Sequence, residues 1–198
     1  MNQCHTHTDI DSVLQDFPVG MEAIYDRMAS SVVELPSARD RMLATRIIQC
    51  ITCSLRPLSI DELTQALGGI VENILDLPRT VVDLCGGFII VDNDGNANLV
   101  HQTAREYLLN DRADRPLQIS RGNAHKQMFL DTMRCLMSNN LRVRLARDQN
   151  IPFVQYAVES WSSHLVHATY DDNDCVTTLK KFLTGRWALT WIHALAIR

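Results

Sequence analysis

The sequence predicts a mainly α-helical protein, because apolar residues recur at helical spacing along most of its 198 residues. Hydrophobic residues make up 46% of the chain and charged residues 21%, a composition that provides a packed core and excludes a disordered or low-complexity protein. Only residues 88–101 have the β-branched, turn-interrupted pattern of strands instead. We therefore expect helices around a single small hairpin.

The first three predicted helices are separated by prolines. Residues 10–17 and 21–35 have helical periodicity, and we expect Pro18 to separate them. A longer helix follows at residues 38–54 and has the length of a central helix of a domain. Its apolar stripe consists of Leu43, Ile47, Cys50, Ile51 and Leu55.

A capping box predicts the start of the next helix. The Ser59 hydroxyl can accept from the Glu62 N–H while the Glu62 carboxylate reaches back to the Ser59 N–H. We expect this helix to end at the glycine pair 68–69, and a further helix, residues 77–84, to end at the pair 86–87.

The strand-like stretch, residues 88–101, is predicted to be a β-hairpin with an Asp-Gly turn. A helix over residues 104–110 follows, with Thr103 as its expected N-cap and Glu106 completing a second capping box. Three helices, a two-stranded hairpin and a following helix make a winged helix. Helical hairpins are expected beyond it, with helices at residues 123–137, 152–168, 175–183 and 187–197.

No catalytic motif is present, so we do not expect an enzyme. A phosphate-binding loop needs a Gly-Lys-Ser/Thr step, and none of the eight glycines is followed by lysine. The sequence also contains neither a nucleophile elbow nor a cysteine-protease signature.

A metal site is possible only at Cys50 and Cys53, which have the C-x-x-C spacing. Imaginable histidine partners are His5, His7, His164 and His167. Because both cysteines fall within one predicted helix and no second C-x-x-C exists, we interpret them as reduced core residues and expect no metal. We interpret His125, His164 and His193 as structural.

Neither nucleic acid nor a membrane is an expected partner. The net charge is −4, and the helix in the recognition position carries Arg79 alone against acidic neighbours. The acidic residues of this helix, its approach and the wing are Glu72, Asp76, Asp83, Asp92 and Asp94. The apolar stretch 187–197 is too short to cross a bilayer, and the chain begins without a signal-like segment, so we expect a cytoplasmic location.

His101 is the remaining polar residue of interest, because it stands where the hairpin is expected to turn into the next helix. A histidine there could donate a hydrogen bond to a phosphate, or it could be a structural residue bonded to the backbone. Spacing alone leaves both interpretations open.

Five stretches of the chain resemble the winged-helix and following region of fungal NACHT-type STAND proteins, the NOD-like receptors tied to heterokaryon incompatibility. They are residues 17–25 (FPVGMEAIY), 56–63 (RPLSIDEL), 83–87 (DLCGG), 100–108 (VHQTAREYL) and 156–165 (YAVESWSSHL). The first is similar to the family's L-P-x-G-L-x-x-x-Y step and the last to its Y-A-x-x-x-W-x-x-H helix.

The resemblance implies a role for His101. In related receptors a Met-His-Asp motif at this junction faces the β-phosphate of ADP, and residues 100–102 (VHQ) stand in its place. His101 is therefore a candidate nucleotide sensor, acting in trans on an NTPase domain absent from this chain, whereas Gln102 departs from the family's aspartate. The chain itself would bind no cofactor, and ADP and ATP would belong to the parent protein.

The resemblance also implies an organisation. Residues 1–36 would be trailing helices of a linking helical domain, 37–112 the winged-helix domain, and 113–198 the truncated start of a second helical domain. The implied partners are the parent's NACHT NTPase domain and other proteins or further copies of the chain.

The implied function is regulatory and non-catalytic, coupling nucleotide state to domain rearrangement in incompatibility-like or innate-immune signalling. Two alternatives remain at this point: a nucleotide-independent helical scaffold and a DNA-binding winged helix.

Overall fold

The computed structural model describes residues 7–110, 115–147, 149–169 and 173–196, and these form ten α-helices, one 3₁₀ turn and a three-stranded sheet. In chain order the elements are α1 (His7–Val33), α2 (Ala38–Cys53), β1 (Leu58–Ser59), α3 (Ile60–Leu67), η1 (Gly68–Ile70), α4 (Leu77–Leu84), β2 (Ile89–Val91), β3 (Asn96–Leu99), α5 (Gln102–Leu108), α6 (Arg121–Leu136), α7 (Leu141–Ala146), α8 (Pro152–His167), α9 (Asn173–Thr184) and α10 (Trp187–Ala196).

The predicted winged helix is present and consists of α2, α3 and α4, the β2–β3 hairpin and α5. The strands are antiparallel in the order β1-β3-β2, and Ile89 pairs with Leu99 in the hairpin. Gly95 takes a φ of +77° in the connecting turn, a conformation that glycine adopts without strain. The third strand, β1, was not predicted, because it has two residues and overlaps the cap of α3.

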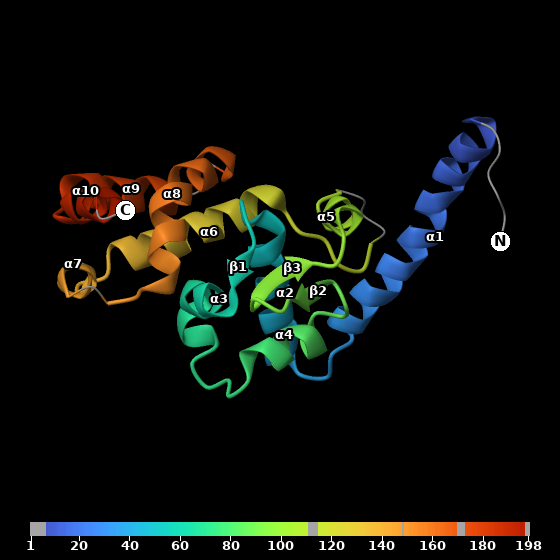
Figure 1. Ribbon diagram of the computed structural model, residues 1–198, viewed down its shortest axis with the longest axis horizontal. Helices are drawn as coiled ribbons and strands as arrows, with labels where there is room; N and C mark the ends of the chain where they lie inside the picture. The colour runs from blue at the N-terminus through green and yellow to red at the C-terminus, as the bar shows by residue number, and fades with distance from the viewer. Residues whose placement is uncertain (1–6, 111–114, 148, 170–172, 197–198) are drawn as a thin grey trace.

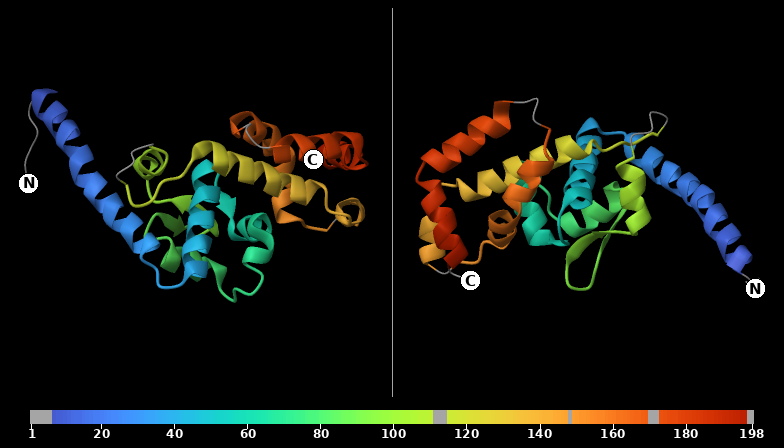
Figure 2. Two further views of the ribbon diagram at one scale, coloured as in Figure 1. Left: turned by 180° about the vertical axis from the view of Figure 1, so that it is seen from behind. Right: turned by 90° about the horizontal axis from the view of Figure 1, so that it is seen from above.

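The molecule is elongated, with α1 projecting from one end and α7 to α10 gathered at the other (Figure 1). The winged helix lies between them, and α6 runs from it into the C-terminal helices, as the two further views also show (Figure 2). The helical region beyond α5 therefore continues directly from the winged helix.

Helix α2 is the centre of the winged helix, because its side chains are buried on several faces. Ile47, Ile48 and Cys50 are fully inaccessible to solvent, and α1, α3, α4 and α6 all pack against the helix. Leu55, expected in the same stripe, is instead 52% exposed, because the helix ends at Cys53 and Leu55 lies beyond it.

Helix α1 differs from its prediction, since it runs without a break through Pro18. A proline removes one backbone hydrogen bond from a helix, but its fixed φ is compatible with helical geometry, so interruption is not obligatory. The C-terminal part of α1 is packed into the core, where Tyr25, Ala29 and Val32 are buried.

The C-terminal helices match the predicted helices to within two residues at each end, except that α7 was not predicted. Helix α6 is the centre of this region: it packs along α8 and also contacts α2, where Arg46 pairs with the buried carboxylate of Asp131. None of the described helices is both long and apolar enough to cross a membrane.

The docking of α1 can be tested at Gly86. This glycine has a φ of +60°, and a Cβ there would lie 2.5 Å from the carbonyl oxygen of Met28. We expect Gly86→Ala to lower the free energy of unfolding by about 2 to 4 kcal/mol, because a strained backbone and a clash combine. Urea denaturation measures this loss.

The matched control is Gly95→Ala, where φ is also positive but no atom lies within 4 Å of the added Cβ. Strain alone should cost about 1 kcal/mol there. Equal losses in the two variants would show that contact with α1 does not constrain Gly86.

Candidate functional site

His101 is the N-cap of α5, with an extended backbone at φ −159° and ψ 156°. Its ring nitrogen Nδ1 accepts a hydrogen bond from the Thr103 N–H at 3.2 Å. The prediction that Thr103 caps this helix, with Glu106 completing a capping box, was therefore wrong. The helix begins two residues earlier than expected, at Gln102, because the imidazole nitrogen takes the place of the usual side-chain oxygen.

The Thr103 hydroxyl extends this contact to α1. Its Oγ1 lies 2.8 Å from His101 Nδ1 and 2.7 Å from the Tyr25 hydroxyl. Because Nδ1 accepts from a backbone N–H, it carries no proton in the neutral ring, and the proton is on Nε2. Within the described residues, the side-chain hydrogen bonds of His101 all involve Nδ1, and the residue is exposed. Nε2–H is therefore a donor on the surface.

A groove of about 270 Å³ lies beside His101, between the end of α2, strand β3 and the start of α5. Two arginines line it, Arg56 and Arg105. Arg105 donates from Nε to the Thr52 carbonyl at 2.7 Å and from Nη2 to the Ser54 carbonyl at 2.8 Å. Its cation thus caps the C-terminal carbonyls of α2, where positive charge also suits the helix dipole.

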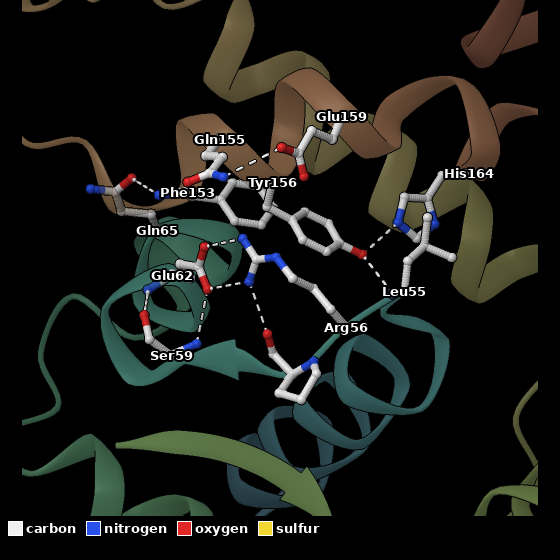
Figure 3. A network of polar contacts seen from close by, with 11 residues as sticks. Leu55, Arg56, Ser59, Glu62, Gln65, Phe153, Gln155, Tyr156, Glu159 and His164 are labelled. Carbon is white, nitrogen blue, oxygen red and sulfur yellow. Dashed lines mark hydrogen bonds and ion pairs between the residues drawn. The ribbon is translucent and has the colours of Figure 1, made fainter. Parts of the chain in front are cut away.

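Arg56 is held by Glu62, as Figure 3 shows, through two hydrogen bonds of 2.8 and 2.6 Å. Glu62 also accepts from the Ser59 N–H at 2.9 Å, while its own N–H donates to the Ser59 hydroxyl, so the predicted capping box is confirmed. This pair neutralises Arg56. His101 contributes an uncommitted Nε2–H donor to the groove.

Tyr156 on α8 links the C-terminal helices to the residues that follow α2. Its hydroxyl accepts from the Leu55 N–H at 3.1 Å and bonds His164 Nε2 at 2.8 Å, and its ring lies under the Arg56 guanidinium, 5.1 Å from centroid to Cζ (Figure 3). Burial raises the pKa of the Tyr156 hydroxyl, so it stays protonated. Gln65 of α3 provides a second contact, since its side chain accepts a hydrogen bond from the Phe153 N–H at the start of α8.

His164 and His125 lie together between α8 and α6, with their Nδ1 atoms 2.9 Å apart. Burial lowers the pKa of His125 to about 4 and that of His164 to about 3, so both rings are neutral near pH 7. The interpretation of these two histidines as structural is confirmed. His193 is partly buried, while His5 and the side chain of His7 fall outside the described part of the chain.

Cys50 and Cys53 are buried in α2, which confirms their interpretation as core residues. Burial raises the pKa of the Cys50 thiol to about 12 and that of Cys53 to about 11, which disfavours the thiolate that a metal needs. Among the described residues, no group of three or more histidine, cysteine or acidic side chains could hold a metal ion.

The acidic wing has local structural roles. Asp92 accepts from the Asn96 N–H at 2.8 Å and the Asp94 N–H at 3.0 Å, and the first of these bonds is the main cause of its lowered pKa. On α4, Arg79 pairs with Asp83 at 3.4 Å, which offsets the positive charge of the recognition-position helix. Such a surface opposes binding to a phosphate backbone.

The family model for the winged-helix domain of GPI inositol-deacylase matches residues 27–120. The chain is also 27% identical, over 224 residues, to the vegetative incompatibility protein HET-E-1 of Podospora anserina. These similarities support the resemblance to the winged-helix region of fungal NACHT-type proteins. The second alignment covers 93% of this chain and 16% of the fungal protein, and no solved structure matches significantly.

The region that the family model matches is a winged-helix domain and not a catalytic domain. It includes the last turns of α1 and reaches residue 120, next to α6. His101, the Arg56–Glu62 pair and the groove all fall inside it, whereas Tyr156, His164 and His125 lie beyond it.

Removing the Tyr156 hydroxyl should destabilise the fold. We expect Tyr156→Phe to lower the free energy of unfolding by about 1 to 3 kcal/mol, because the Leu55 N–H and the buried His164 Nε2 lose a partner. Gln155→Ala is the control, since this exposed residue of α8 has only a 3.3 Å bond to Glu159 and should stay within about 0.5 kcal/mol. Equal stability of Tyr156→Phe and wild type would show that the hydrogen bonds of the Tyr156 hydroxyl do not stabilise the fold.

Acid should also destabilise the protein. The pKa of histidine in an unfolded chain is about 6.5, whereas those of His125 and His164 are lowered by burial, so the unfolded state binds more protons as pH falls below about 6.5. Stability is therefore lost between pH 6.5 and about 3. Urea unfolding at pH 7, 6 and 5 should give a falling free energy, and His125→Asn should reduce the slope; an unchanged slope would contradict the assignment.

Proposed function

We propose that this chain is a non-catalytic regulatory segment of a NACHT-type signalling NTPase, in which His101 donates a hydrogen bond to the β-phosphate of a nucleotide held by the NTPase domain. The observation that carries the proposal is the outward Nε2–H of a ring whose Nδ1 is fixed by Thr103. The nearby arginines already bond Glu62 and the end of α2, and His101 Nε2–H is a donor available for an anion.

The proposed mechanism is a difference in contact between two states. With ADP bound, His101 holds the winged helix against the NTPase domain, and exchange for ATP removes this contact and frees the segment to rotate and self-associate. One hydrogen bond to a charged group contributes about 1.5 to 3 kcal/mol, which shifts a two-state population about tenfold or more. A cytoplasmic location is part of this proposal.

The contacts around Tyr156 support rotation of the winged helix and the helices α6 and α8 as one body. Leu55, at the end of α2, and Arg56 both contact this α8 side chain, and Arg46 of α2 pairs with Asp131 of α6. Breaking one buried pair of this kind is costly, so the contact with nucleotide would move the whole unit.

The first requirement of the proposal is an NTPase domain in the same polypeptide. Sequencing the transcript upstream of Met1 should reveal an in-frame G-x-x-x-x-G-K-[ST] motif. An in-frame stop codon without such a motif would contradict the proposal and favour a nucleotide-independent scaffold.

The second test changes His101 without removing the helix cap. Asparagine is a good N-cap but lacks the Nε2 donor, so His101→Asn should leave thermal stability of this chain within about 0.5 kcal/mol. In the longer protein it should speed release of labelled ADP about tenfold or more. An unchanged release rate in a stably folded His101→Asn protein would rule out the phosphate contact.

A further inference from the structure

Tyr25 connects helix α1 to the ring of His101. The tyrosine is 4% exposed, and its ring lies 6.0 Å from that of Phe88 and 5.3 Å from that of Tyr107. Its hydroxyl leaves this aromatic cluster to bond Thr103 Oγ1 at 2.7 Å, across 78 positions of sequence. The apolar ring thus fixes where α1 docks, while the hydroxyl contacts the residue that bonds His101.

When the His101 ring is neutral, the hydrogen bonds that link the Tyr25 hydroxyl, Thr103 Oγ1 and His101 Nδ1 can be donated in only one direction. Nδ1 accepts from the Thr103 N–H and so carries no proton. The 2.8 Å contact between Nδ1 and Thr103 Oγ1 then takes its hydrogen from the threonine hydroxyl, which must in turn accept from Tyr25. The result is a relay from Tyr25 through Thr103 to Nδ1.

We propose that Tyr25 and Thr103 are positioning residues through which the docked α1 holds His101 in its Nε2–H tautomer, with that donor facing the surface. Movement of α1 away from the winged helix would withdraw the Tyr25 hydroxyl and free Thr103 Oγ1 to rotate. The ring would then sample both tautomers and other orientations. The expected effect on nucleotide binding rests on the proposed function, whereas the hydrogen-bond relay from Tyr25 through Thr103 to His101 does not.

The close fit of α1 makes its position a defined state. Gly86 comes against the Met28 carbonyl of α1, and Tyr107 of α5 donates to Asp26 of α1 at 2.6 Å. Helix α1 therefore contacts α5 through two tyrosine hydroxyls, of which only Tyr25 reaches the histidine. This difference provides a matched pair of variants.

The experiment measures the tautomer of His101 by long-range ¹H–¹⁵N correlation on histidine-labelled chain, at a pH where the ring is neutral. Wild type should show Nε2 protonated and Nδ1 unprotonated. Tyr25→Phe and Thr103→Val should lower the ratio of the Nε2–H to the Nδ1–H tautomer by about fivefold, as expected for loss of one neutral hydrogen bond. Thr103→Ser, which keeps the hydroxyl, should restore the wild-type ratio.

Tyr107→Phe is the control, because it removes the other hydroxyl contact of α1 without touching the relay. Its His101 nitrogen shifts should equal those of wild type. An unchanged tautomer ratio in both Tyr25→Phe and Thr103→Val, or an equal change in Tyr107→Phe, would overturn the inference.

No nucleotide enters this measurement, so its failure is separable from failure of the proposed function. If the relay variants shift the tautomer ratio while His101→Asn leaves ADP release unchanged, the relay stands and the phosphate contact fails. If the ratio does not shift while His101→Asn speeds ADP release, the phosphate contact stands and the relay fails.

Discussion

The backbone polar groups at the C-terminal end of α2 need partners, and the rest of the structure is arranged around satisfying them. Arg105 of α5 takes the carbonyls of Thr52 and Ser54, and Tyr156 of α8 takes the N–H of Leu55. A buried backbone group without a partner would cost about as much as a lost hydrogen bond. The contacts at the end of α2 therefore position both α5, whose N-cap is His101, and α8 of the C-terminal region.

The contacts at the end of α2 and around His101 explain how separate parts of the chain can respond together. From one side α1 reaches His101 through the Tyr25 hydroxyl, and from the other α8 reaches the end of α2 through Tyr156. The arginines near His101 hold the end of α2 in place, Arg56 through Glu62 and Arg105 through the backbone carbonyls of Thr52 and Ser54. His101 is thus an exposed donor, and in the proposed mechanism the loss of this modest contact shifts the population of two states without unfolding either.

The sequence predicted those elements that local signals define: the capping box at Ser59, the helix Leu77–Leu84 and the hairpin that follows. It missed the cap of α5, because threonine is a commoner N-cap than histidine and stood two residues later. The contact between Leu55 and Tyr156 spans 101 positions, and no local pattern encodes such a pair. The spacing of Tyr156 and His164 along one helix, about two turns, was the only signal available for their bond.

The proposed contact between His101 and a phosphate is tested most directly by a structure of the proposed NACHT-type parent protein with ADP bound. We predict that His101 Nε2 lies within about 2.7 to 3.2 Å of a β-phosphate oxygen, with Nδ1 still bonded to Thr103. A His101 side chain facing solvent or protein, with the β-phosphate contacted only by the NTPase domain, would contradict it.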